Sequence, residues 1–141
     1  MNEPLVFHFD IDGEDFAAAG QASVQIKKSL RQLGLSPEII RRVSIAMYEG
    51  EINMVIHAHG GTADVKVYED CIEIILADNG PGIEDIDMAM KEGYSTASDT
   101  TRSLGFGAGM GLPNMKRYTD DMQVESILGV GTTVTMRINI A

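Results

Sequence analysis

Four glycines alternate with other residues in the stretch LGFGAGMGLPN, which spans residues 104–114: Gly105, Gly107, Gly109 and Gly111. Glycine has no side chain to pack in a strand, but it leaves consecutive backbone N–H groups open to an anion, in a nest or at a helix N-terminus. The run leads into a predicted helix that carries Lys116 and Arg117. It does not fit a P-loop, because Leu112 and Pro113 stand where Lys and Ser or Thr are needed, nor does it have the glycine spacing of a dinucleotide-binding fingerprint. The run therefore indicates either an anion-binding loop or a tight turn required by packing.

An acid and an amide, Glu49 and Asn53, stand four residues apart in the stretch YEGEINMVIH. On a helix, this spacing places both side chains on one face, about one turn apart. Isoleucines flank that face, so we expect it to be at least half buried, and an unpaired buried carboxylate is costly. The pair is therefore either functional or two polar residues at an exposed helix edge. Glu51 lies roughly 200° around the same helix, and we expect it on the solvated face.

A third candidate is Asp78, which ends a β-rich run and is followed by Gly80 and Gly82 in the stretch ILADNGPGI. Glycines two and four positions after an aspartate let the chain turn sharply beside the carboxylate, and they let a flat ligand approach the backbone. A simple Asn-Gly-Pro-Gly turn is the alternative interpretation.

These residues need a scaffold, and the hydrophobic pattern predicts one. Ser36 as N-cap, Pro37 at the first helical position and the stop at Gly60 mark both ends of a long helix that carries Glu49 and Asn53. The other expected elements are a strand at 5–11, a helix at 14–33, strands at 62–70 and 71–77, a short helix near 83–91, a helix at 112–120 and strands at 122–127 and 131–140. This order predicts an α+β two-layer sandwich, with helices covering one face of a mixed, mostly antiparallel sheet.

A long stretch between Asp78 and Gly111 shows little regular pattern, and seven of the fifteen glycines fall between residues 80 and 111. Such a stretch inside a compact domain is either disordered or a functional loop. Because it is bracketed by apolar elements, we favour a lid or binding loop.

Composition limits the number of domains, the class of partner and the compartment that the sequence allows. The 141 residues predict one domain, 1–141, and a net charge of −10 argues against nucleic acid as a partner and for a partner with a basic surface. No apolar run approaches the roughly 18 residues that span a membrane. The acidic N-terminus does not resemble a signal peptide, and the single cysteine, Cys71, fits a reducing compartment. We therefore expect a cytoplasmic protein.

Together, Glu-x-x-x-Asn, Asp-x-Gly-x-Gly, the alternating glycines and a closing Gly-Thr-Thr follow one order in the chain. That order resembles the GHKL ATP-binding family, which includes gyrase-type topoisomerases, heat-shock chaperones, mismatch-repair ATPases and histidine kinases. The stretches DNGPGI, GYST, GMGLPNMKR and GTTVTM are more closely similar to the anti-sigma-factor serine kinases and the stress-response switch kinases. This resemblance covers nearly the whole chain and implies the GHKL fold with a glycine-rich ATP lid.

The resemblance implies a role for each candidate at the base end of the nucleotide. Asp78 would accept the adenine amino group, and Thr133 would support that contact through water. Gly80 and Gly82 would let the base lie against the backbone.

At the phosphate end, the resemblance implies that Asn53 holds Mg²⁺ through its side-chain oxygen, as suits a hard ion that also uses substrate phosphates. Glu49 would be the general base for the attacking hydroxyl. Arg102 would neutralise charge on the phosphates. The lid glycines would donate N–H groups to them: Gly105, Gly107, Gly109 and Gly111.

The function implied is a protein serine/threonine kinase that uses Mg-ATP to phosphorylate a serine on a small antagonist protein of STAS fold, and so controls partner exchange and transcription. In the family such kinases commonly form homodimers, and the anti-sigma members also sequester a sigma factor. Two alternatives remain open: a non-catalytic ATP-sensing module, and a detached histidine-kinase catalytic domain.

Overall fold

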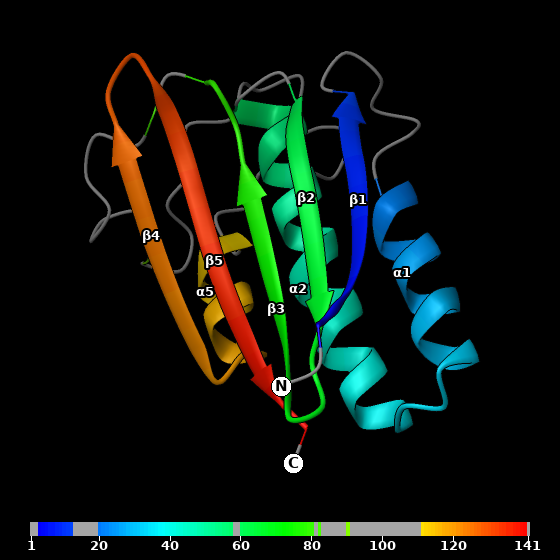
Figure 1. Ribbon diagram of the computed structural model, residues 1–141. Coiled ribbons are helices and arrows are strands. Elements are labelled where there is room, and N and C mark those ends of the chain that lie inside the picture. Colours follow the sequence, from blue (N-terminus) through cyan, green and yellow to red (C-terminus); the bar gives the residue numbers. More distant parts are fainter. Residues whose placement is uncertain are drawn as a thin grey trace.

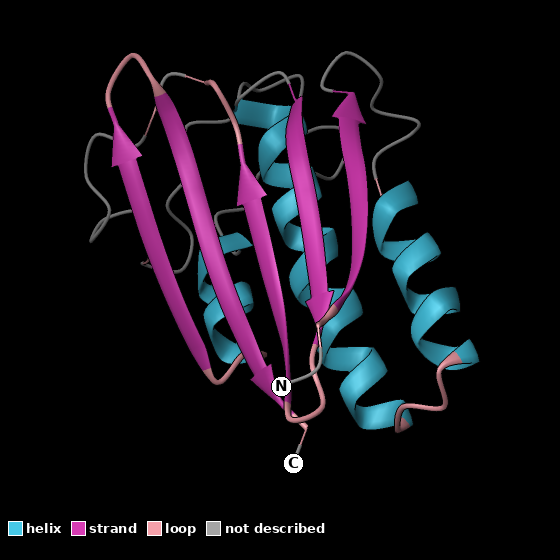
Figure 2. Cartoon of the chain, viewed as in Figure 1, coloured by secondary structure: helices cyan, strands magenta, loops and turns pink. Residues whose placement is uncertain are grey.

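The computed structural model describes residues 3–12, 20–57, 60–80, 82, 90 and 111–140. Their elements follow in the order β1 (Leu5–Asp12), α1 (Gln21–Gln32), α2 (Pro37–His57), β2 (Gly60–Val67), β3 (Cys71–Ala77), α5 (Gly111–Arg117), β4 (Asp121–Ile127) and β5 (Gly131–Asn139). The helices lie on one side of the sheet, with α2 between α1 and α5 (Figures 1 and 2). The predicted α+β two-layer sandwich is confirmed.

The sheet has five strands in the order β1-β2-β3-β5-β4, and each of the four pairings between these described strands is antiparallel. Two tight turns set the register of the hairpins. Tyr68 N–H donates to the Cys71 carbonyl (2.8 Å) between β2 and β3, and Val130 N–H donates to the Ile127 carbonyl (3.0 Å) between β4 and β5. The insertion of β5 between β3 and β4 brings the closing strand beside the end of β3, where Asp78 lies.

Alternation along the strands places one row of side chains against the helices. In β3 these are Ile72, Ile74 and Leu76, each at most 3% exposed. The largest fully buried hydrophobic side chains come from both layers: Ile26, Leu30, Val43, Met47, Val65, Ile72, Ile74, Met115, Met136 and Ile138. This apolar layer fixes α2 against the sheet, and with it the residues that α2 carries.

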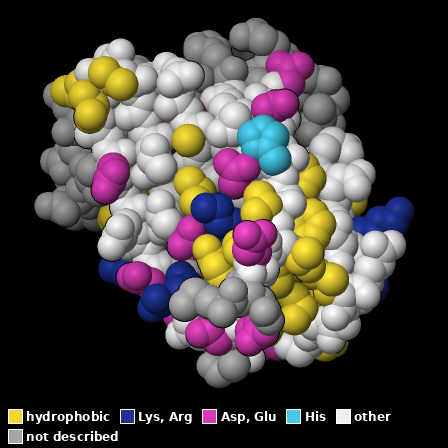
Figure 3. Space-filling model, viewed as in Figure 1, with side chains coloured by type: hydrophobic (Ala, Val, Ile, Leu, Met, Phe, Trp, Pro, Cys, Tyr) yellow, Lys and Arg dark blue, Asp and Glu magenta, His cyan; other side chains and the backbone are white. Residues whose placement is uncertain are grey.

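The opposite face of the sheet carries no helix among the described elements (Figure 1). Figure 3 shows this face, with acidic and basic side chains among apolar ones and an apolar group over the β4–β5 hairpin. Three residues there are highly exposed: Ile127, Leu128 and Val130.

The long helix opens as predicted, since the backbone N–H of Ile39 donates to Oγ of Ser36 (3.3 Å). At its other end, α2 ends at His57, and Gly60 and Gly61, expected to mark the stop of the helix, are the first residues of β2. The first helix was expected from residue 14, whereas α1 starts at Gln21 and residues 13–19 lie outside the described part. The short helix expected near 83–91 likewise falls outside it, apart from residue 90.

Candidate active site on the central helix

The two polar residues of the long helix lie on α2 as expected. Glu49 and Asn53 are both half-buried, one turn apart. Between Glu49 and Glu51, Gly50 is buried, and a Cβ built there would lie 2.0 Å from Cδ1 of Leu76 on β3. The absence of a side chain therefore lets this turn of α2 approach the sheet closely.

Glu49 contacts a residue far away in the sequence. Nδ2 of Asn114 on α5 donates to Oε1 of Glu49 at 3.4 Å. Burial raises the pKa of Glu49 above its ordinary value, and the hydrogen bond from Asn114 opposes that rise. A carboxyl group with a raised pKa, half-buried beside an amide, is typical of a general base.

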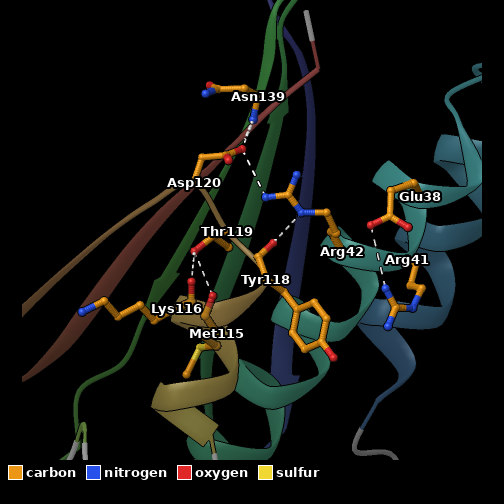
Figure 4. A network of polar contacts seen from close by, with 9 residues as sticks. All are labelled: Glu38, Arg41, Arg42, Met115, Lys116, Tyr118, Thr119, Asp120 and Asn139. Atoms are coloured by element: carbon orange, nitrogen blue, oxygen red, sulfur yellow. Dashed lines mark hydrogen bonds and ion pairs between the residues drawn. The ribbon is translucent and has the colours of Figure 1, made fainter.

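The short helix α5 is fixed on α2 by both apolar and polar contacts. Leu112 and Met115 are buried in the core. At the other end, Nε of Arg42 donates to the Tyr118 carbonyl (3.0 Å), and its guanidinium lies 3.2 Å from Oδ2 of Asp120 (Figure 4). A cation near the C-terminus of a helix is favourable because it satisfies carbonyl groups that have no partner within the helix. This anchoring sets the position of Asn114 relative to Glu49.

Asp120 joins the same network to the end of the sheet. Its Oδ2 accepts a hydrogen bond from the backbone N–H of Asn139 (2.7 Å) and also forms the ion pair with Arg42. The hydrogen bond from Asn139, followed by the contacts with Arg42, lowers the pKa of Asp120. Arg41, one residue before Arg42, stacks over the ring of Tyr118 at 5.3 Å from its centroid. Figure 4 shows how these contacts join α2, α5 and the C-terminal end of β5.

Asp78 follows β3 and is held by backbone groups. Its Oδ1 accepts the N–H of Gly80 (2.9 Å) and the N–H of Thr132 (3.2 Å), and its own N–H donates to the Thr132 carbonyl (2.9 Å). Among the described residues, no hydrogen bond reaches Oδ2 of Asp78. One oxygen is therefore fixed to the backbone, and the other is open to a donor on a ligand.

Glycines allow the backbone to pack tightly around Asp78. Gly82 has a φ of +83°, and a Cβ there would lie 2.7 Å from the carbonyl oxygen of Ile127. At Gly131, a Cβ would lie 2.0 Å from the carbonyl oxygen of Asp78. Glycine is therefore required at position 82 for packing as well as for the predicted access of a flat ligand, because it lets the chain after β3 approach the β4–β5 hairpin.

Gly61 connects the two groups of candidate residues. A Cβ at this position would meet both Sδ of Met54 (2.8 Å), which follows Asn53 on α2, and Cα of Asp78 (3.1 Å). The C-terminal half of α2 and the end of β3 therefore border the same glycine. Met54, the chain neighbour of Asn53, and Asp78 therefore lie on either side of Gly61.

The threonine expected to support Asp78 lies on the wrong face. Thr133 occupies a position in β5 that alternates with the buried residues Thr132 and Val134, so it points away from the helical layer. Thr132 is the residue whose N–H contacts Asp78, and its hydroxyl lies 2.9 Å from that of Ser126. The apolar residues of β5 stand at even-numbered positions in the sequence. This alternation indicates that Thr132, also at an even position, faces the site.

The expectation for Glu51 is also wrong. This side chain is 1% exposed and accepts three backbone N–H groups around the start of α1: Gly20 (2.9 Å) and Ala22 (3.2 Å) at Oε2, and Ser23 (2.6 Å) at Oε1. The side of α2 opposite Glu49 is covered by α1 rather than by water. Glu51 therefore caps α1 from another helix.

Four of the five predicted phosphate-binding residues lie outside the part of the chain that the structure describes. These are Arg102, Gly105, Gly107 and Gly109, whereas Gly111 is the first residue of α5. Their roles stay predictions. Within the described ranges, no helix is long and apolar enough to cross a membrane.

Comparisons with known proteins identify the family of this chain. Residues 38–141 match the family described as histidine kinase-, DNA gyrase B- and HSP90-like ATPase. An anti-sigma F factor of Clostridium novyi is 34% identical over 122 residues, covering 82% of each chain. The serine/threonine-protein kinase RsbT of Bacillus subtilis is 32% identical over 124 residues, covering 85% of each chain.

A solved structure shares the fold. The RsbU and RsbW domains of a Mycobacterium tuberculosis protein match with a TM-score of 0.65 at 16% identity, and the match covers 95% of this chain and 31% of that chain. With the family model and the two relatives, the resemblance predicted from the motifs is confirmed. The chain belongs to the histidine kinase-, DNA gyrase B- and HSP90-like ATPase family, and within it to the branch of anti-sigma factors and protein serine/threonine kinases.

Proposed function

We propose that this chain uses Mg-ATP to phosphorylate a serine on a small antagonist protein of STAS fold, and that this phosphorylation controls the exchange of protein partners. The observation that carries the proposal is the Glu49 carboxylate. It is half-buried, and its pKa is raised. It shares one helix face with Asn53, and it accepts a hydrogen bond from Asn114 on α5, the helix that follows the glycine run. The kinship with RsbT, a serine/threonine-protein kinase, supports the same chemistry.

The arrangement around Asp78 fits an adenine base. Oδ1 is held by Gly80 and Thr132, which orients Oδ2 to accept the exocyclic amino group. A carboxylate accepts hydrogen bonds and donates none, so it favours adenine over guanine at this point. We propose that Thr132, rather than Thr133, is the threonine that supports this contact.

The phosphates and metal belong nearer to α2. The side-chain oxygen of Asn53 suits Mg²⁺, which prefers oxygen ligands and retains part of its shell from water and phosphate. Mg²⁺ bound there would offset the negative charge of the phosphates. We propose that the backbone N–H groups of the glycine run and the guanidinium of Arg102 hold the same phosphates.

Glu49 is then the proton acceptor. Its carboxylate takes the proton from the attacking serine hydroxyl while the phosphorus–oxygen bond to the γ-phosphoryl group forms and the bond to ADP breaks. Because burial raises its pKa, Glu49 is a stronger base than an exposed glutamate. The same group must be ionised to act, so activity falls as the pH drops through this pKa.

The partners are proposed from kinship and charge. The relatives named anti-sigma F factor support a sigma factor as a second partner. A net charge of −10 favours a basic surface on whichever protein binds. We also propose a homodimer in the cytoplasm, as the resemblance implies.

The test is phosphoryl transfer from labelled ATP, with Mg²⁺, to the antagonist encoded nearest to the gene of this protein. We expect acid-stable phosphoserine on the antagonist. Glu49→Gln should lower the rate roughly 10²–10⁴-fold, the usual contribution of a general base. Glu38→Gln is the matched control, because Glu38 lies on the same helix with an exposed side chain.

Three outcomes would overturn parts of the proposal. Acid-labile phosphohistidine would point to a detached histidine kinase. Binding of ATP without transfer to the antagonist would indicate a sensing module. Transfer that Glu49→Gln leaves undiminished would remove Glu49 from the role of base.

A further inference from the structure

Asn114 lies between two charged side chains that favour one orientation of its amide. Nη1 of Arg117 donates to Oδ1 of Asn114 (3.4 Å), and Nδ2 of Asn114 donates to Oε1 of Glu49 (3.4 Å). A guanidinium has no acceptor and a carboxylate has no donor. This chemistry favours the orientation in which the amide oxygen faces Arg117 and the NH₂ group faces Glu49.

The position of Asn114 is set by the scaffold rather than by its own contacts. Leu112 and Met115, on either side of it in α5, are buried in the core. The last residues of the same segment are fixed by the hydrogen bond from Arg42 to the Tyr118 carbonyl and by the Thr119 hydroxyl, which donates to the Met115 carbonyl (2.8 Å). These contacts hold Asn114 in place whichever way Glu49 turns.

The other charged groups near this part of the fold are engaged elsewhere. On α2, Glu51 points to the N-terminus of α1, and Arg42 is paired with Asp120. Asp78, at the end of β3, is bonded to backbone N–H groups. Among the described residues, the groups that affect the pKa of Glu49 are thus its apolar surroundings, which raise it, and Asn114, which lowers it.

We propose that Asn114, oriented by Arg117, is a positioning residue that holds the carboxylate of Glu49 in the orientation required for proton abstraction. This inference rests on the proposed role of Glu49 as general base. Both contacts are long at 3.4 Å, and catalytic hydrogen bonds commonly shorten when the substrates bind. Asn114 is 65 residues from Glu49 in the chain, so only the packing of α5 on α2 brings the two together.

The first test is kinetic. Asn114→Asp keeps the size of the side chain but replaces the donor with a second carboxylate, and Asn114→Ala removes the group. We expect kcat at neutral pH to fall roughly tenfold for Asn114→Ala and further for Asn114→Asp, because a hydrogen bond to a charged group is lost and then replaced by repulsion. The dissociation constant of ATP should stay within about twofold in both variants, because the inference gives Asn114 no contact with the nucleotide.

The pH profile separates positioning from a structural role. Without Asn114 the pKa of Glu49 rises, so the acid limb of kcat should move to higher pH and the deficit should shrink as the pH increases. A folding or packing defect would instead lower kcat equally at every pH. Lys116→Ala is the matched control, because Lys116 is exposed on the same helix and should leave the profile unchanged.

A second measurement does not need catalysis. Carbon-13 NMR titration of the Glu49 carboxyl group should show a higher pKa in Asn114→Ala than in the wild type, and a smaller rise in Arg117→Ala. No rise in Asn114→Ala would overturn the inference even if the wild type transfers phosphate. A clear rise in a protein that transfers no phosphate would overturn the proposed function and leave the contact standing. An ATP affinity weakened more than tenfold would also overturn the inference, because Asn114 would then be a nucleotide ligand.

Discussion

The two oxygens of Asp78 have different partners, and that difference defines the site at the scale of single residues. Oδ1 is held by the backbone N–H groups of Gly80 and Thr132. Among the described residues, Oδ2 accepts no hydrogen bond. A carboxylate anchored through one oxygen keeps the other in a fixed direction, so a ligand donor meets it without the side chain first having to be ordered.

Asp78→Asn tests this assignment. The asparagine keeps an oxygen for the two backbone donors, and this turns its NH₂ group toward the adenine amino group, so that two donors face each other. We expect the affinity for ATP to weaken by roughly 1–3 kcal/mol, the range for a lost buried hydrogen bond. Isothermal titration calorimetry measures the dissociation constant of ATP, and Asp121→Asn, on the exposed face of β4, is the control. An unchanged dissociation constant would contradict the adenine contact.

At the scale of elements, α1 depends on a side chain of α2. The residue before α1 is Gly20, whose φ is 97° and which supplies no side-chain cap. Glu51 supplies the cap instead, with three backbone N–H groups bound to one buried carboxylate. The ring of Tyr48 covers the same glycine, since a Cβ at Gly20 would lie 3.0 Å from its Cε1. The same turn of α2 thus carries Glu49 on one side and anchors α1 on the other.

Glu51→Ala should lower the free energy of unfolding by roughly 2–4 kcal/mol, because it leaves the N–H groups at the start of α1 without their acceptor and opens a cavity. Glu51→Gln should cost less, because its amide oxygen still accepts. Urea unfolding measures both effects. Glu38→Ala, on the exposed first turn of α2, should change stability by less than about 0.5 kcal/mol. A similar small change for Glu51→Ala would show that water can replace the carboxylate.

At the scale of the whole molecule, charge makes stability depend on pH. The net charge is −10, and carboxylates lie on the open face of the sheet together with His8. Nδ1 of His8 lies 2.6 Å from Oδ1 of Asp64 on β2, and its Nε2 lies 3.2 Å from Oδ1 of Asp10. The hydrogen bond to Asp64, then that to Asp10, raises the pKa of His8 above 6.5. β1 is an edge strand that pairs with β2, so these contacts join it to the rest of the sheet.

A histidine whose pKa is raised by folding stabilises the protein when it is protonated. The contribution of His8 should therefore be complete below its unfolded pKa and should disappear as the pH rises through its higher folded pKa. We expect the wild type to exceed His8→Gln in melting temperature near pH 5.5, with the difference shrinking toward pH 8.5. Asp64→Asn should reduce this pH dependence. A constant difference across the range would show that the charge of His8 contributes nothing.

Several features of this protein could be predicted from the sequence because they depend on neighbours in the chain. The capping residue Ser36 and the apolar spacing of α2 predict a helix that places Glu49 and Asn53 on one face, as the structure has them. The alternation in β3 and the turn at residues 69–70 predict the hairpin that leads to Asp78. The order of elements follows from the same local signals, whereas the family was identified from the resemblance of the motifs.

Other features depend on which elements pack together. Glu51 continues the stripe of Met47 and Val55, but only the presence of α1 on that side makes it a buried cap instead of a solvated residue. The contact of Asn114 with Glu49 needs α5 to lie beside α2. The insertion of β5 between β3 and β4 brings Thr132 to Asp78. Helical period and strand alternation fix how side chains lie about their own element, whereas burial and long-range hydrogen bonds are fixed only when that element meets another.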